Sequence, residues 1–308
     1  MMIKTPSYLK PGDTIGIVCP AGYMALEKAA ECVRVLQEEW GFKVKLGSTL
    51  GGDSTTYFSG TDEERLADFQ AMLDDDEVSA ILCGRGGYGM GRIIEGINFR
   101  QFRKKPKWVI GFSDITIFHT HVYTNYRIAS LHAPMAAAFN DGGYLHPYVI
   151  SLKKALQGKR MKYVSTGNIH NRPGEAVGDL VGGNLALLAH GIGTASELKT
   201  KDRILFIEDI GEQKYSIDRM MFQLKRSGKL DHLAGLIVGR FSDISDTDRP
   251  FGEDLQQIIL DAVKEYSYPV CFEFPVSHNP ENYALKHGVK HRLTLTRRKV
   301  VLEELKSE

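Results

Sequence analysis

One serine of this chain lies where a catalytic nucleophile could be exposed, between an expected strand and an expected helix. The segment Lys107–Thr116 is typical of a strand that ends at Gly111, a sharp turn at Ser113 and Asp114, and a helix from about Ile115. A nucleophile elbow has this architecture because the serine hydroxyl must be exposed at the carboxyl end of a strand. The match to Gly-x-Ser-x-Gly is incomplete, since Gly111 precedes the serine by two positions but Ile115 follows it by two. A serine or aspartate before a helix is also a good N-cap, so spacing alone leaves a purely structural role open.

A cluster of glycines follows the third expected strand, Val78–Cys83. Gly84, Gly86 and Gly89 match Gly-x-Gly-x-x-Gly, the spacing of dinucleotide-binding loops that present a helix N-terminus to a pyrophosphate. That motif normally follows a first strand and needs an acidic residue about 20 positions further on. Here it follows the third strand, and no Asp or Glu lies near Trp108–Ile110. Three interpretations stay open: a nucleotide site, a tight turn, or paired backbone N–H groups that face a catalytic centre as an oxyanion hole requires.

A serine nucleophile needs a base, and the base needs an acid that orients it. Among ten histidines, His278 follows an expected strand end and lies in a loop, where catalytic residues are often held; a solvated loop histidine is the alternative. Glu208 and Asp209 end the apolar strand Arg203–Ile207, and a carboxylate that leaves a buried strand needs a partner because desolvating it alone is costly. Either carboxylate could instead cap the next turn or pair with Arg219.

Metal and phosphate chemistry find little support in the spacing of the candidate ligands. His119 and His121 lie two apart on an expected helix, so they point to different faces. His287 and His291 are separated by Gly288, which makes a helical i, i+4 pair doubtful. No Cys, His or Asp cluster has metal-ligand spacing, and the sequence contains no Walker A motif.

Strands and helices alternate along the first half of the chain and must position these residues. Strands are expected at Thr14–Cys19, Phe42–Leu46, Val78–Cys83 and Trp108–Gly111, with helices at Leu26–Glu39, Thr61–Leu73 and Ile115–Thr124. The second of these helices opens with a Thr-x-x-Glu capping box. This alternation predicts an α/β fold with a doubly wound parallel sheet, whose ligands bind beyond the carboxyl ends of the strands.

A polar, turn-rich segment divides the sequence. Lys159–Gly174 shows neither a helical nor a strand period, so we expect a linker at 166–175 between a domain of residues 1–165 and a smaller α/β domain of residues 176–308. The second domain is expected to contain strands at Val177–Val181, Arg203–Ile207, Leu236–Val238 and Val270–Phe274, helices at Ile217–Arg226 and Leu255–Glu265, and a hairpin of Arg292–Leu295 with Lys299–Glu303.

The composition narrows the class of function. The 308 residues include 39 Lys and Arg against 38 Asp and Glu, so neither nucleic acid nor an anionic membrane is expected as the main partner. Four scattered cysteines suit a reducing cytoplasm, and neither a signal peptide nor an apolar run of the ~18–20 residues that a membrane helix needs is visible. Glycine accounts for 31 of the 308 residues, or about 10%, which is above the average of about 7%. This surplus indicates places where the backbone closely approaches another group.

These segments resemble the LD-carboxypeptidase family of serine peptidases, which comprises murein tetrapeptide carboxypeptidases and microcin-immunity relatives. The resemblance extends over nearly the whole chain and rests on ordered blocks: Gly84–Gly89, Gly111–Asp114, His132–Met135, Val181–Leu185, Phe206–Asp209, Tyr215–Arg219, and His278 followed by Asn282, Leu285 and Gly288. It implies an amino-terminal domain that carries the nucleophile and is similar to class I glutamine amidotransferases. The smaller carboxyl-terminal domain would carry the acid and the base.

The resemblance implies a Ser–His–Glu triad of Ser113, His278 and Glu208, with no metal or organic cofactor. The backbone N–H groups of Gly87 and Asp114 are the candidates for stabilising the oxyanion. The implied reaction is hydrolysis of the amide between an L-configured centre and a terminal D-amino acid, releasing D-Ala from murein tetrapeptide in peptidoglycan recycling. The implied partners are a small peptide substrate and a second copy of the chain in a homodimer.

Three positions depart from the family pattern and keep alternatives open. Ser277 replaces a common Gly before the histidine, Lys286 replaces a common Pro, and Ala133 replaces a common Gly. They affect loop conformation, which leaves substrate preference more open than chemistry. One alternative is a microcin-immunity-like peptidase that cleaves aminoacyl-nucleotide amides; those relatives carry a longer insertion with an aromatic clamp for the nucleobase, whereas Trp40 and Trp108 here both lie in the first domain. The alternative from another class is a non-catalytic nucleotide-binding module built on the glycine cluster.

Overall fold

The computed structural model describes residues 3–306 and divides the chain into two compact units, each with its own sheet. The first unit extends to Lys159 and also contains Tyr283–His287, and the second unit contains Arg160–Asn282 and the chain from Gly288 onward. Strands and helices alternate in both units, which confirms the expected α/β class.

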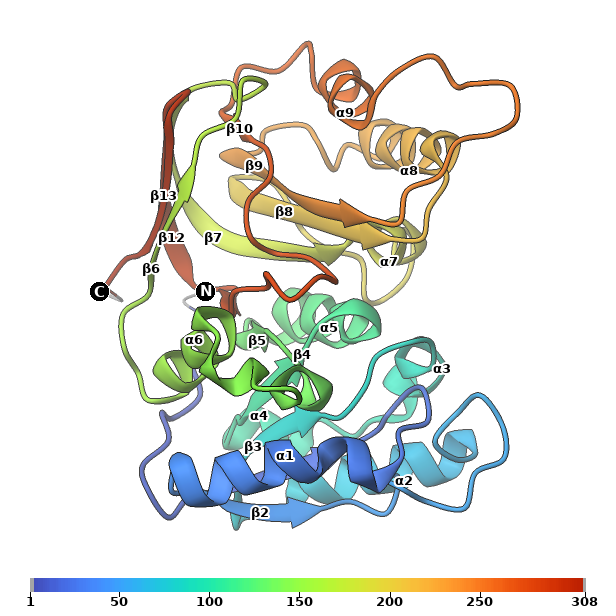
Figure 1. Ribbon diagram of the computed structural model, residues 1–308, viewed down its shortest axis with the longest axis vertical. Coiled ribbons are helices and arrows are strands. Elements are labelled where there is room, and N and C mark those ends of the chain that lie inside the picture. Colours follow the sequence, from blue (N-terminus) through green and yellow to red (C-terminus); the bar gives the residue numbers. More distant parts are fainter. Residues whose placement is uncertain (1–2, 307–308) are drawn as a thin grey trace. The chain divides into compact units, whose positions relative to one another are not determined.

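The first unit is built on a six-stranded sheet in the order β11-β5-β4-β3-β1-β2. Its strands are β1 (Thr14–Val18), β2 (Lys43–Leu46), β3 (Val78–Cys83), β4 (Trp108–Gly111), β5 (Ser130–His132) and β11 (Leu285–His287). The first five run parallel, and β11 pairs antiparallel with β5. Strands β1, β3 and β4 are buried along almost their whole length, as expected of parallel strands that helices cover on both faces. Figure 1 shows helices on both sides of this sheet.

Helices and helical turns connect these strands. They are η1 (Leu26–Ala29), α1 (Ala30–Arg34), the π-helical turn η2 (Val35–Glu39), α2 (Asp62–Asp74), α3 (Met90–Ile93), η3 (Ile94–Gly96), α4 (Arg100–Lys104), η4 (Ser113–Ile115), α5 (Thr116–Tyr126), η5 (Ala136–Phe139), η6 (Gly143–Leu145) and α6 (Pro147–Leu156). The expected capping box is present, because the Thr61 hydroxyl accepts from the Glu64 N–H and the Glu64 carboxylate accepts from the Thr61 N–H. The four strands and three helices predicted for this half are therefore confirmed, with ends shifted by at most two residues.

The second unit is built on a seven-stranded mixed sheet in the order β10-β9-β8-β7-β12-β13-β6. Its elements are β6 (Lys162–Thr166), β7 (Gly174–Asn184), α7 (Leu185–His190), β8 (Arg203–Ile210), α8 (Lys214–Arg226), β9 (Gly235–Ser242), α9 (Leu255–Ala262), β10 (Val270–Cys271), β12 (Lys290–Leu295) and β13 (Lys299–Glu304). Strands β7 to β10 pair in parallel, whereas β12, β13 and β6 pair antiparallel. Figure 1 shows α7, α8 and α9 beside the parallel strands. The expected hairpin near the end of the chain is confirmed by β12 and β13.

The segment interpreted as turn-rich contains a strand. β6 (Lys162–Thr166) pairs antiparallel with β13, as the edge of the second sheet. The expectation of no strand was wrong there, because the apolar Val164 is exposed beside the buried Tyr163, so the sequence of this edge strand does not alternate apolar and polar residues. The boundary between the two units consequently lies between Lys159 and Arg160, rather than at residue 165, where the sequence predicts the end of the first domain. Residues 167–173, within the expected linker, lie outside the named strands and helices.

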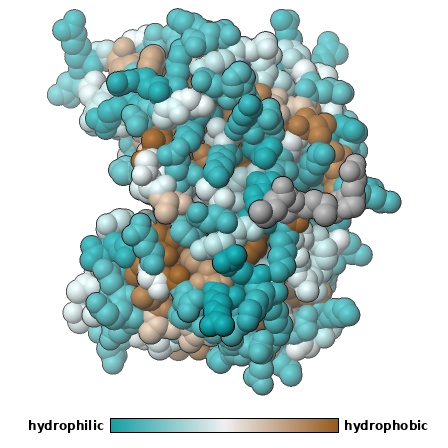
Figure 2. Space-filling view, turned by 180° about the vertical axis from the view of Figure 1, so that it is seen from behind, coloured by the Kyte–Doolittle hydropathy of each residue, from teal (hydrophilic) through white to brown (hydrophobic). Residues whose placement is uncertain are grey.

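Hydrophilic side chains cover most of the face drawn in Figure 2, and hydrophobic residues occur there in small patches. Within residues 3–306, no helix combines the length and the apolar composition needed to cross a bilayer.

Candidate active site

Ser113 lies in a strained turn of the first unit, between the end of β4 and the start of α5. Its φ of 59° places it in the left-handed region, which costs an L-residue other than glycine roughly 1–2 kcal/mol. Residues on both sides hold this backbone in place. The Gly111 carbonyl accepts from the Ala133 N–H (3.1 Å) and from His119 Nε2 (2.9 Å), and the Ile115 N–H donates to the Phe112 carbonyl (3.2 Å). The predicted strand–turn–helix is therefore confirmed, with a backbone conformation that needs this support.

The N-cap interpretation of Ser113 and Asp114 is wrong. Neither side chain caps α5, whose N-cap position is Ile115. The buried Asp114 carboxylate instead accepts the Met90 N–H at 2.7 Å, at the first residue of α3. Burial raises the pKa of Asp114 to about 6, against the opposing effect of hydrogen bonds from the Met90 and Gly89 N–H groups.

The glycine cluster lies directly beside Ser113, within the first unit. A Cβ added at Gly86 would lie 3.0 Å from Ser113 Cβ and 3.2 Å from its Oγ, so only a glycine leaves the hydroxyl open on this side. Gly87 follows with a φ of +103°. The interpretation of the glycine cluster as a pyrophosphate-binding loop is weakened, because the N-terminus of α3 already binds the Asp114 carboxylate. The two predicted oxyanion donors, the N–H groups of Gly87 and Asp114, follow directly on Gly86 and Ser113, and their role stays a prediction.

Glu208 and His278 form a hydrogen-bonded pair in the second unit. Glu208 lies near the end of β8 and is fully buried, and its Oε2 lies 2.6 Å from His278 Nδ1. A carboxylate oxygen only accepts, so Nδ1 carries the proton and the lone pair of the neutral ring is on Nε2. Burial by itself would lower the pKa of His278, but the hydrogen bond and charge of Glu208, with the charge of Asp209, raise it above its usual value.

The loop that carries His278 is fixed to the sheet of the second unit by its backbone. The Phe274 N–H donates to the Val238 carbonyl of β9 (3.2 Å), and the Arg240 N–H donates back to the Val276 carbonyl (3.0 Å). Ser277, which replaces a common glycine of the family, closes the loop. Its Oγ accepts from the Asn279 N–H (3.0 Å) and donates to the Glu281 carbonyl (3.1 Å). The serine therefore supports the turn at the histidine with hydrogen bonds that a glycine could not make.

Asp209 has a different task from its neighbour Glu208. Its carboxylate accepts from Asn184 Nδ2 (2.7 Å) and from the Ala186 N–H (2.9 Å), at the start of α7. Burial raises the pKa of Asp209 to about 6. Arg219, the alternative partner in the sequence analysis, bonds the Ser216 hydroxyl and lies over the ring of Tyr215. Asp209 therefore stabilises the start of α7, whereas Glu208 binds the histidine.

Three histidines gather beneath the Ser113 turn, which the sequence analysis did not anticipate. The ring of His119 stacks on that of His287 (centroids 5.7 Å apart) and lies 6.4 Å from that of His132. Complete burial lowers the pKa of His119 to about 4. Its Nε2 must donate to the Gly111 carbonyl, so Nδ1 accepts from the Ser130 hydroxyl at 2.8 Å. In the part of the chain that the structure describes, no group of three or more His, Cys, Asp or Glu could hold a metal ion. His119 supports the turn through its hydrogen bond to the Gly111 carbonyl.

A further residue missed from the sequence is Arg65, a buried arginine of α2. Its guanidinium contacts the loop that carries the glycine cluster, through the Gly89 carbonyl. No signal in the sequence marks it, because Asp62 and Asp68 lie three positions to either side, as on an ordinary solvated helix face.

The structure brings together two sets of predicted residues. Glu208 and His278 meet in the second unit. In the first unit, Gly86, which precedes Gly87, lies against the side chain of Ser113, which precedes Asp114. That these two sets act as one site remains a prediction.

Comparisons with known proteins identify the family. Two family models match the chain: the LD-carboxypeptidase N-terminal domain over residues 15–133 and the LD-carboxypeptidase C-terminal domain over residues 177–293. A Bacillus subtilis protein named "Probable murein peptide carboxypeptidase" is 38% identical over 306 residues, which cover 98% of this chain and 95% of that protein. The Escherichia coli microcin C7 self-immunity protein MccF is 24% identical, over 96% of this chain and 94% of its own.

A solved structure agrees with this assignment. The crystal structure of muramoyltetrapeptide carboxypeptidase from Oxalobacter formigenes matches with a TM-score of 0.85 and 26% identity, over 95% of this chain and 99% of that chain. The matches extend through both units, which carry the serine turn and the Glu–His pair. The chain therefore belongs to the LD-carboxypeptidase family and is a serine-type carboxypeptidase.

Proposed function

We propose that this enzyme releases D-Ala from murein tetrapeptide, by hydrolysing the amide between an L-configured centre and the terminal D-amino acid, in peptidoglycan recycling. The observation that carries the proposal is the 2.6 Å hydrogen bond between Glu208 and His278. In the neutral ring this bond places the proton on Nδ1 and the lone pair on Nε2, the base that an acyl-transfer reaction by a serine requires. The relatives named for murein peptides support the choice of substrate.

The proposed reaction proceeds in two steps. Ser113 Oγ attacks the amide carbonyl while His278 Nε2 takes its proton, and the same proton then passes to the departing amine of D-Ala. A water molecule, deprotonated by His278, then attacks the resulting ester. The bond to Ser113 Oγ breaks, His278 gives its proton to that oxygen, and the shortened peptide and the free serine are released. Glu208 holds the tautomer throughout and stabilises the imidazolium.

The tetrahedral intermediate of each step carries a negative oxygen. The N–H groups of Gly87 and Asp114 are the proposed donors to it. Losing one such donor typically costs roughly 3–4 kcal/mol of barrier stabilisation. The Asp114 side chain accepts from the Met90 N–H, which helps to hold this residue in place directly after Ser113.

The test is mass spectrometry of murein tetrapeptide after incubation with the wild type and with Ser113→Ala. We expect loss of one alanine residue with the wild type alone. A matched peptide that ends in L-Ala should stay intact, because the proposal specifies a D-configured leaving group. An unchanged tetrapeptide with the wild type, or equal turnover by Ser113→Ala, would contradict the proposal.

Cleavage of aminoacyl-nucleotide amides is less well supported. The microcin self-immunity protein is a relative over most of the chain, but the aromatic clamp expected of that group has no tryptophan available here. Trp108 is fully buried and Trp40 is 6% exposed. Incubation with an aspartyl sulfamoyl adenosine separates the two substrates, and we expect no cleavage.

A cytoplasmic location and a homodimer also stay predictions. The four cysteines are all free and buried, as a reducing compartment would allow. Light scattering coupled to size-exclusion chromatography measures the mass in solution, and we expect twice the 34.4 kDa of one chain.

A further inference from the structure

Arg65 is a buried guanidinium that joins three loops of the first unit. It comes from α2, and its side chain is fully buried. Nη1 donates to the carbonyls of Pro20 (2.5 Å) and Gly89 (3.1 Å), and Nε donates to that of Gly60 (3.3 Å). Nη2 pairs with the Asp62 carboxylate.

Two of these loops lie at the edge of the sheet where a ligand is expected to bind. Pro20 follows β1 and Gly89 follows β3, so both lie beyond the carboxyl ends of parallel strands, where ligands bind in sheets of this kind. A planar guanidinium with several donors in fixed directions can hold several carbonyls at once, which an ammonium group does poorly. Leaving such a charge buried would be costly without these partners.

The peptide group between Gly89 and Met90 is held from both ends. Its carbonyl accepts from Arg65, and its N–H donates to the Asp114 carboxylate at 2.7 Å. Asp114 directly follows Ser113, so this one peptide group connects the guanidinium to the serine turn. Gly89 has a φ of +155°, and an added Cβ there would lie 2.7 Å from Arg65 Nη1. The close approach of the arginine therefore depends on the glycine.

We propose that Arg65 is a positioning residue for catalysis: by fixing the Gly89–Met90 peptide, it sets the direction of the glycine loop that contributes the Gly87 N–H beside Ser113. The inference rests on the proposed function, because it assigns that N–H to the oxyanion. Arg65 touches no reacting atom in this role and acts through the backbone of the loop.

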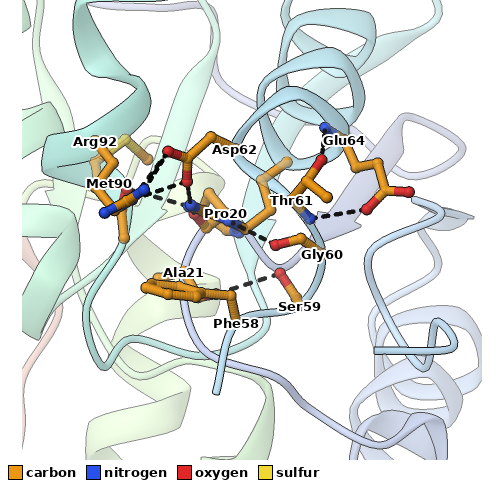
Figure 3. Close-up of polar contacts among 12 residues, drawn as sticks. Pro20, Ala21, Phe58, Ser59, Gly60, Thr61, Asp62, Glu64, Met90 and Arg92 are labelled. Atoms are coloured by element: carbon orange, nitrogen blue, oxygen red, sulfur yellow. Dashed lines mark hydrogen bonds and ion pairs between the residues drawn. The ribbon is translucent and has the colours of Figure 1, made fainter. Parts of the chain in front are cut away.

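Arg92 provides a matched control. It pairs with the same carboxylate, Asp62, at 2.7–2.9 Å, and it lies over the same Phe58 ring at 5.5 Å, compared with 4.8 Å for Arg65. In Figure 3, Asp62 and Arg92 face each other near Pro20, Gly60 and Met90. The guanidinium of Arg92 interacts with other side chains rather than with backbone carbonyls, and the Arg92 side chain is 46% exposed.

The experiment compares Arg65→Met, Arg65→Lys and Arg92→Met with the wild type. It measures kcat and KM on murein tetrapeptide, the rate of inactivation by a fluorophosphonate, and the unfolding midpoint in urea. We expect Arg65→Met to lower kcat and the inactivation rate by about 10–100-fold with KM within twofold, since small misplacements in a site cost up to roughly 10²-fold. Arg65→Lys should recover part of both rates, and Arg92→Met should leave both within twofold.

The outcomes separate the inference from the proposed function. If the wild type neither reacts with the fluorophosphonate nor shortens the peptide, the proposed function fails. If the wild type is active and a folded Arg65→Lys or Arg65→Met keeps both wild-type rates, the inference is overturned. It is also overturned if Arg92→Met slows both rates as much as Arg65→Met does, or if neither Arg65 variant folds, because Arg65 would then serve stability alone.

Discussion

The two sets of candidate residues are positioned in opposite ways. In the first unit, Ser113 depends on its backbone: a φ of 59°, a glycine loop against its hydroxyl and a strand end held by a histidine. In the second unit, His278 depends on a side chain, because the buried Glu208 determines its tautomer and raises its pKa. The position of the proposed nucleophile therefore depends on backbone shape, and the properties of the proposed base depend on a neighbouring charge.

This difference predicts different kinds of sensitivity. Changes in shape around Ser113 should lower turnover with little effect on the pH profile. Changes in charge around His278 should move the pH profile as well as turnover. Four substitutions, from the largest expected effect to the smallest, test this division.

Ser113→Ala removes the proposed nucleophile and should have the largest effect. Loss of a serine nucleophile lowers kcat by about 10⁶-fold in a comparable triad. Steady-state turnover of murein tetrapeptide measures it, and fluorophosphonate labelling should disappear. Ser113→Gly is the matched variant for the backbone, since it is equally inactive but relieves the left-handed strain. We expect it to exceed Ser113→Ala in stability by roughly 1 kcal/mol in urea unfolding, and equal stabilities would argue against a strained turn.

Glu208→Gln tests the charge side of the comparison. An amide of the same shape favours the wrong tautomer and should lower kcat by roughly 10⁴-fold. With the carboxylate gone, burial is left as the main effect on His278, so its pKa should fall. The base acts in its neutral form, and the acidic limb of kcat/KM should therefore move to lower pH.

Asp209→Asn is the control for that prediction. Asp209 bonds Asn184 and Ala186, so its loss should act mainly on stability. A loss of kcat as large as that of Glu208→Gln would remove the distinction between the two carboxylates.

Gly86→Ala tests the shape side. Its methyl group would lie 3.0–3.2 Å from the Ser113 side chain, and we expect kcat to fall by about 10–100-fold through displacement of the hydroxyl. The pH at half-maximal kcat/KM should stay unchanged. Gly91→Ala provides the control, because an added Cβ there meets nothing within 4 Å. A shift of the pH profile in Gly86→Ala would break the division between shape and charge.

His119→Gln should have the smallest effect, on stability rather than chemistry. The pKa of folded His119 is about 4, below the ordinary 6.5. As the pH falls from 6.5 to 4, the unfolded chain takes up a proton that the folded chain does not, so neutral His119 stabilises less and less. Urea unfolding across this range measures the effect. The difference in unfolding free energy between wild type and variant should therefore shrink toward acid pH. A constant difference for His119→Gln would mean that the histidine contributes packing alone.

The sequence sufficed where the signal is local. Val78–Cys83 and Trp108–Gly111 are apolar runs between turn signals, and their observed bounds are the predicted ones. The capping box of α2 lies within four residues and was equally readable. Family resemblance, rather than spacing, selected Ser113, Glu208 and His278 from among other serines, acids and histidines.

The rest depended on contacts between distant residues. The three-residue strand β11 pairs with β5 some 150 positions earlier and has no pattern of its own. α6 did carry a signal, a proline at its first turn followed by apolar residues at helical spacing, which went unused. The hydrogen bonds of the Arg65 guanidinium and the stacking of His119 on His287 connect residues that are far apart in the sequence. These residues become neighbours only once the sheet has formed.

The return of the chain to the first unit at β11 restricts how the protein could be divided into two fragments. After the His278 loop, five residues belong to the first unit before the chain rejoins the second at Gly288. A gene split after residue 159 would give a first fragment whose sheet ends at β5, with its edge N–H and C=O groups unpaired and prone to association. It would also lack His287 from the stack beneath the serine turn. We therefore expect that a single crossover would not exchange the two halves between relatives, and that a functional chimaera needs the segment 283–287 to come from the same parent as Ser113.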